Sequence, residues 1–193
     1  MPDSPARRIV VPALLASLLA ASAWISIPMG SVPFTLQIFV VVLCALLLTP
    51  RQAAATLGVY LGLGALGAPV FSGGVGGLGV LLGPTGGYLL GFLVGAVVGA
   101  MIREHMIRRG TQELSADLSA GFATLVIVYL IGWLQLSRVT GMSGIEAFVA
   151  GVVPFVLLDV FKTATAAAVA AALRRSGVVQ QTGLRRAAGR EAR

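Results

Sequence analysis

Two residues of opposite charge lie three positions apart in a strongly apolar stretch near the end of the chain. Asp159 and Lys162 occur within PFVLLDVFKTATAAA, where a membrane-spanning helix is predicted. A spacing of three places both side chains on one helix face, close enough to pair. A charge at the centre of such a helix costs about 2.5–3.5 kcal/mol on insertion scales. Since a buried ion pair rarely stabilises a protein more than apolar residues would, we favour a binding role facing a cavity over a structural one.

Residue sets for catalysis or metal binding are missing from the sequence. It contains a single histidine, His105, a single cysteine, Cys44, and seven acidic residues. These supply no Ser/His/Asp set, no metal-ligand cluster and no paired catalytic carboxylates. The segment Gly83–Gly87 lacks the Gly-Lys-Ser/Thr ending of a phosphate loop. We therefore expect no enzyme activity, no cofactor and no metal.

The composition indicates an all-α integral membrane protein. Of the 193 residues, 57% are hydrophobic and 11% are charged, whereas soluble domains carry about 25% charged residues. A spanning helix needs about 20 apolar residues, so the chain has room for six spans but for no soluble ATP-binding domain. The net charge of +7 comes from residues at the ends of apolar segments. Because they form no single basic face, nucleic acid is not an expected partner and membrane lipid is.

Six apolar segments are predicted to form membrane helices, followed by a basic tail. A polar loop from Arg103 to Asp117, which includes a solvated His105, separates the fourth segment from the fifth. We expect residues 1–173 to form the transmembrane domain and residues 174–193 to form a flexible tail. The predicted helices are Ile9–Ile27, Phe34–Leu48, Ala53–Leu66, Pro84–Ile102, Leu118–Leu136 and Ile145–Leu173.

The arginines predict the orientation of these helices. If the N-terminus is cytoplasmic, six spans place both termini and two loops inside. Arg138 is then the one basic residue outside, and Lys162 lies within a span. All other basic residues fall inside, as the positive-inside rule requires: Arg7, Arg8, Arg51, Arg103, Arg108, Arg109, Arg174, Arg175, Arg185, Arg186, Arg190 and Arg193.

The outer connection Gly67–Gly83 is apolar, rich in glycine and uncharged. Irregular backbone at membrane depth is tolerated where it is buried or lines a cavity. We interpret the segment as a wall over an outward-facing pocket, with a plain packing loop as the alternative. Glycines four residues apart predict close helix packing in two places. They are Gly58 and Gly62, and then Gly87, Gly91, Gly95 and Gly99.

Several short motifs, in the same order along the chain, resemble the BioY family. These proteins are the biotin-binding S components of energy-coupling-factor (ECF) transporters. The motifs are Val32–Gln37 (VPFTLQ), Gly67–Phe71 (GAPVF), Gly83–Tyr88 (GPTGGY), and Pro154-Phe155 with Asp159 and Lys162. They cover nearly the whole membrane region, whereas the tail after Arg174 lies outside the resemblance.

The resemblance implies a six-helix S-component bundle that captures biotin for uptake across the bacterial cytoplasmic (inner) membrane. Its implied partners are a transmembrane coupling protein and two ATPase subunits. The small-residue face that meets the coupling protein corresponds to Ala16 and Ala20. Asp159 and Lys162 correspond to ligand-contacting residues, and we expect further substrate contacts from motif residues Phe34, Gln37, Phe71 and Tyr88.

The chemistry of biotin agrees with these residues. Biotin has a carboxylate, an apolar bicyclic body, and a ureido group with two N–H donors and one carbonyl. Lys162 can bind an anion or the ureido carbonyl, and Asp159 can accept from an N–H. Two alternatives stay open: a proton-coupled secondary carrier in which Asp159 titrates, and a purely structural membrane protein.

Overall fold

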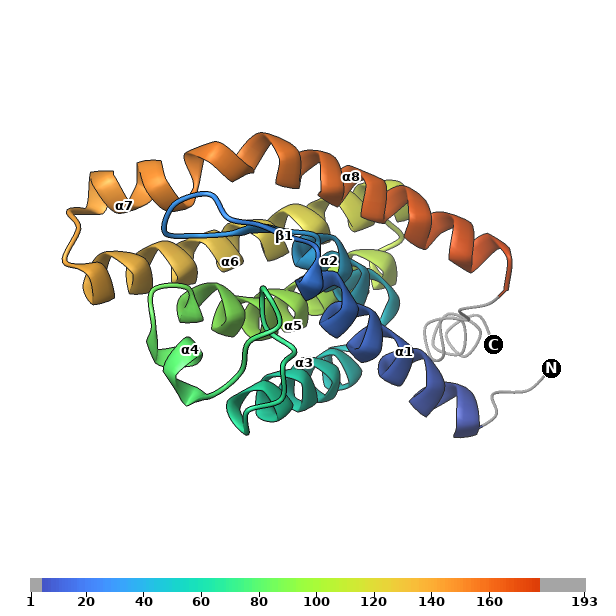
Figure 1. The fold of residues 1–193 in the computed structure, drawn as a ribbon. Helices are drawn as coiled ribbons and strands as arrows, with labels where there is room; N and C mark the ends of the chain where they lie inside the picture. Colours follow the sequence, from blue (N-terminus) through green and yellow to red (C-terminus); the bar gives the residue numbers. More distant parts are fainter. Residues whose placement is uncertain (1–4, 178–193) are drawn as a thin grey trace, which may run out of the picture.

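The computed structural model describes residues 5–177, and most of them are helical (Figure 1). Within this range, α5, α6 and α8 are long and apolar enough to cross a membrane, and α2 and Ile9–Trp24 of α1 form shorter apolar helices. The elements are α1 (Pro5–Trp24), β1 (Ser26–Ile27), β2 (Phe34–Thr35), α2 (Gln37–Leu47), α3 (Pro50–Ala65), α4 (Leu78–Leu82), α5 (Gly86–Arg108), α6 (Glu113–Thr140), α7 (Gly144–Gly151) and α8 (Val153–Arg175).

Helix α2 forms the centre of the bundle. Nine of its eleven residues are buried, and it packs against α1, α5, α6 and α8. Figure 1 shows the start of α1, the α5–α6 connection and the end of α8 toward one end of the bundle, on the right of the view. We call this the basic end, because it carries Arg103, Arg109 and Arg174. The helix α4, the α6–α7 connection and the β1–β2 hairpin lie toward the other end.

The ends of the first two predicted helices differ from the structure. Helix α1 ends at Trp24, and Ser26–Ile27 pairs antiparallel with Phe34–Thr35, with Ser26 opposite Thr35. The second helix consequently begins at Gln37 instead of Phe34. Apolar periodicity could not separate these strands from the helices beside them, because a strand of two residues is too short to show a period of its own.

The predicted polar loop from Arg103 to Asp117 is wrong in extent. Helix α5 continues to Arg108 and α6 begins at Glu113, which leaves a connection of residues 109–112. Basic side chains in the last turn of α5 and an acidic one in the first turn of α6 complement the helix dipoles, so charge did not mark a loop. His105 is exposed as expected, but it belongs to α5.

The sixth predicted helix is broken into α7 and α8. Val152 departs from helical geometry (φ −125°, ψ −54°), and Pro154 lies in the first turn of α8. Proline has no N–H and its ring clashes with the preceding turn, so a straight helix cannot pass through it. At its other end, α8 includes Arg174 and Arg175, which were expected in the tail. Residues 178–193 of that tail lie outside the described residues.

The glycine repeat of α5 forms a close contact with α6, as predicted. A β-carbon on Gly91 would lie 2.9 Å from Val128 Cα, and one on Gly95 would lie 2.8 Å from the Thr124 carbonyl oxygen. The repeat of α3 behaves differently. Gly58 and Gly62 are exposed, and a β-carbon at either would meet nothing within 4 Å among the described residues. The glycine spacing is the same in both helices. Among the described residues, however, the α5 glycines contact another helix and Gly58 and Gly62 of α3 do not.

A buried charge cluster joins three helices at the basic end. Asp117 of α6 is fully buried and accepts from Arg103 Nε of α5 at 2.6 Å. Its other carboxylate oxygen accepts from Arg174 of α8, which also lies 3.5 Å from Glu113. Buried charges need such partners, because removing one of them leaves the other uncompensated. The cluster therefore fixes α5, α6 and α8 against one another at this end.

Substituting Gly91 with alanine should destabilise the fold, whereas the same change at Gly58 should not. The added methyl group at Gly91 meets the α6 backbone, which cannot rotate away, and such overpacking costs about 1–3 kcal/mol. At Gly58 the methyl group enters open space, and alanine favours a helix by up to about 1 kcal/mol. Thermal melting of both purified variants in one detergent tests this, and a Gly91→Ala protein that melts with the wild type would contradict it.

Candidate functional site

A cavity of about 190 Å³ lies in the half of the bundle away from the basic end. It is many times the size needed for one water molecule. Its walls come from residues 32–38 at the end of the hairpin, from the cover segment (residues 67–83) and from the first turns of α5, and also from α6 and α8. The prediction that Gly67–Gly83 forms a wall over a pocket is thus confirmed.

The cavity walls are mainly apolar and aromatic, with a few polar groups. Such a combination is typical of small-molecule sites, in which the apolar surface holds the ligand and the polar groups orient it. Asp159, Gln37 and Thr35 supply polar groups from α8, α2 and β2. The aromatic side chains are Phe34, Phe71, Tyr88, Phe92, Tyr129 and Phe155.

The Asp159 carboxylate on the cavity wall has a protein partner for each oxygen. Lys162 Nζ donates to Oδ1 at 2.7 Å, and the Tyr129 hydroxyl donates to Oδ2 at 2.7 Å. Asp159 is 4% exposed. A carboxylate has about four acceptor positions, so two of them remain for a ligand.

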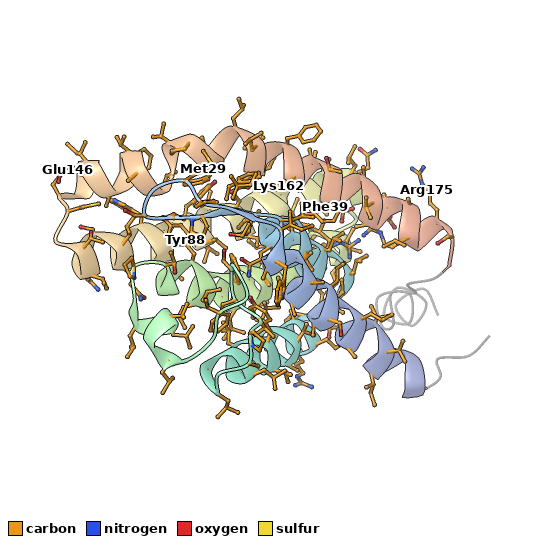
Figure 2. All side chains as sticks on the ribbon, in the orientation of Figure 1. Met29, Phe39, Tyr88, Glu146, Lys162 and Arg175 are labelled. Carbon is orange, nitrogen blue, oxygen red and sulfur yellow. The ribbon has the colours of Figure 1, made fainter. Side chains whose placement is uncertain are left out.

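Lys162 lies behind the wall and does not line the cavity. Its Nζ donates to the Thr35 carbonyl oxygen at 2.6 Å and stands 3.6 Å from the centre of the Phe34 ring. Figure 2 shows Lys162 on α8 beside the hairpin. The ammonium group thus balances the charge of Asp159 and also fastens strand β2 to α8.

The cover segment is held from two sides. Phe71 is fully buried against Tyr60, with ring centres 5.6 Å apart in an edge-to-face arrangement. The Gly73 N–H donates to the Ala23 carbonyl at 3.1 Å, and the Ser72 and Ser26 hydroxyls are 2.7 Å apart. The cover segment is therefore connected both to α3 and to the C-terminal end of α1.

The structure brings together most of the residues predicted for substrate binding. Lys162 is the exception described above, and Ala16 and Ala20, predicted for partner binding, are half-buried on α1 and are not in the cavity wall. The roles of Tyr129 and Thr35 as partners of the ion pair were missed, because nothing in their spacing marks a contact between α6, β2 and α8. The residues that do line the cavity are Phe34, Gln37, Phe71, Tyr88 and Asp159.

Comparison with known proteins follows the same line. A "Probable biotin transporter BioY" from Pyrococcus horikoshii is 38% identical, and the match covers 88% of this chain and 97% of the relative. The "Biotin transporter BioY" of Thermotoga maritima is also 38% identical, over 88% of this chain and 96% of the relative.

The crystal structure of the S-component for biotin from an ECF-type ABC transporter has the same fold. The TM-score is 0.83 at 22% identity, with 90% of this chain and 95% of that chain covered. A model of the BioY family matches residues 1–178, nearly all of the chain. This chain therefore belongs to the BioY family.

Proposed function

We propose that this protein captures biotin and serves its uptake as the substrate-specific component of an ECF transporter. The observation that carries the proposal is a largely aromatic cavity, with one ion-paired carboxylate on its wall, in a member of the BioY family. Its curated relatives are transporters, not enzymes. Together with its long apolar helices, this makes the chain a multi-pass membrane protein.

The cavity supports biotin by its chemistry. The free acceptor positions of Asp159 suit a ureido N–H, and the rings of Phe34, Phe71 and Tyr88 suit the apolar bicyclic body. Because Lys162 is already bonded to Asp159 and Thr35, we assign it to holding the site together. The valerate carboxylate of biotin then extends away from Asp159, whose charge would repel it.

We place the basic end in the cytoplasm and the cavity toward the outside of the cytoplasmic membrane of a bacterium. The arginines at the basic end support this orientation by the positive-inside rule. Six spans follow if α1, α2, α3, α5 and α6 each cross and α7 and α8 together form the last. Residues 1–173 then make up the membrane domain.

The energy for the release of bound biotin comes from partner chains. The described residues form one helical bundle without an ATP-binding domain. We therefore infer a transmembrane coupling protein and two ATPase subunits as partners. The exposed face of α1 is the proposed docking surface, and Ala16 and Ala20 border it.

The purified chain should bind biotin without any nucleotide, at about one site per chain. Calorimetry with micromolar biotin, on protein shown to be monodisperse, measures this directly. Absence of any heat change in folded protein would refute the proposal. Uptake that persists without ATPase subunits and follows a proton gradient would instead favour a secondary carrier.

Asp159→Asn and Lys162→Gln should each fold and should weaken biotin binding by about tenfold or more, equivalent to about 1.4 kcal/mol. The first change removes a charged acceptor from the cavity wall, and the second frees the hairpin from α8. Arg108→Gln is the matched control, since its ion pair with Glu104 is exposed and far from the cavity. A lowered melting temperature with unchanged biotin affinity would show that the pair is purely structural.

Ala16→Leu and Ala20→Leu should spare biotin binding and weaken association with the coupling protein. Larger side chains keep helices apart where small ones allow close approach. Ala168→Leu, on the exposed face of α8, makes the same change on another helix. Co-purification with the coupling protein measures the effect, and equal recovery of all three variants would exclude this surface.

A further inference from the structure

We propose that the side-chain amide oxygen of Gln37 is a second acceptor in the cavity and that Tyr60 and the Val70 carbonyl fix it in that role. Together with Asp159 it would accept from the two N–H groups of the biotin ureido ring, one each. The inference rests on the proposed function, because it names the part of biotin that these residues select.

The orientation of the Gln37 amide follows from the position of a single proton. The Tyr60 hydroxyl lies 2.9 Å from the Val70 carbonyl oxygen and 2.7 Å from the Gln37 amide nitrogen. A carbonyl oxygen cannot donate, so the one Tyr60 proton goes to Val70. The Tyr60 oxygen can then only accept from Gln37, which must present its NH₂ group. A reversed amide would place two acceptors against each other or leave the Val70 carbonyl without this donor.

The Gln37 amide, the Tyr60 hydroxyl and the Val70 carbonyl have little freedom to rearrange. Tyr60 and Gln37 are each 2% exposed, and the Tyr60 ring packs edge-to-face against the fully buried Phe71. Gln37 is the first residue of α2, and its backbone N–H donates to Thr35 Oγ1 at 3.3 Å. The start of α2, the contact between Tyr60 and Phe71, and the Val70 carbonyl of the cover segment therefore hold the Gln37 amide in one orientation.

The remaining atom, Gln37 Oε1, has no hydrogen-bond donor among residues 5–177, and the side chain lines the cavity. Asp159 Oδ1 and Oδ2 each keep an acceptor position after bonding Lys162 and Tyr129. The polar part of the wall thus presents acceptors from two elements, α2 and α8. A ligand that lacks one N–H would leave one of these buried acceptors unpaired, which is costly.

Two singly N-methylated biotins, each lacking one ureido N–H, test this assignment. The measured quantity is the ratio of the Kd for each analogue to the Kd for biotin, in the full chain in detergent. Wild type should show ratios of about tenfold or more for both analogues. In Gln37→Leu the ratio for one analogue should fall by about fivefold or more, and in Tyr60→Phe by about threefold. The ratio for the other analogue should not change.

Thr124→Val is the matched control. It also removes a buried hydroxyl that donates to a backbone carbonyl, that of Gly95 at 3.1 Å, but Thr124 is not part of the cavity wall. Both ratios should stay at their wild-type values in this variant, whatever its affinity for biotin. A general loosening of the fold would lower the affinity for biotin and for both analogues together, and would leave the ratios unchanged in all variants.

Three results would overturn the inference. Unchanged ratios in Gln37→Leu, with biotin still bound, would show that Gln37 reads no ureido N–H. Wild-type ratios near one would show that the cavity does not select for these groups. Folded wild-type protein that binds no biotin would overturn the proposed function as well. Gln37→Leu keeps the test decisive if Tyr60→Phe does not fold.

Discussion

The cavity depends on the ion pair and the hydrogen bonds that the Asp159 carboxylate makes. A charge inside a membrane bundle persists only with partners, and this one draws them from separate parts of the chain. Tyr129 comes from α6, Lys162 comes from α8, and Lys162 brings the Thr35 carbonyl with it. The groups that compensate the charge of this one carboxylate therefore hold three parts of the cavity wall in place. These protein partners leave further acceptor positions of the carboxylate free, and a ligand in the cavity can donate hydrogen bonds to them.

The two ends of the bundle satisfy their buried polar groups in different ways. At the basic end, the Asp117 carboxylate is enclosed by Arg103 and Arg174. Between the ends, glycines let α5 approach α6 until backbone meets backbone. In the other half, the break at Val152 leaves the Gly151 carbonyl to accept from Tyr88. The cavity, whose mainly apolar wall carries a few polar groups, thus opens where the regular helix packing stops.

Much of the bundle could be predicted from the sequence, because apolar length and glycine spacing are local signals. The glycine contact of α5 and the inward fold of the cover segment followed from such patterns. The strands at Ser26 and Phe34 could not be predicted, since two-residue strands carry no periodicity. The helix break could have been predicted from Pro154, which a continuous apolar run concealed.

Five of the six residues predicted for substrate binding line the cavity, but their contacts with other residues could not be predicted. Asp159 and Lys162 were conspicuous because charge is rare in apolar segments, and a spacing of three implied their pairing. That Lys162 also bonds Thr35 depends on tertiary structure alone. The Tyr60–Gln37 contact is equally invisible in the sequence, because neither residue is unusual for its position. The repeat of Gly58 and Gly62 shows that a sequence pattern can also predict a contact that does not form, since here the same spacing occurs on an exposed helix face.

The bond from Lys162 to Thr35 also sets an order of assembly. The two residues are 127 positions apart, whereas α5 and α6 are neighbours joined by a short connection. Helices that are adjacent in the chain can pack as soon as both have entered the membrane. The bond that fastens the hairpin to α8, in contrast, cannot form until the last helix has been synthesised and inserted. The cavity wall is therefore the part of the molecule that is completed last, and a chain that ends before α8 can form the α5–α6 pair but not the complete cavity.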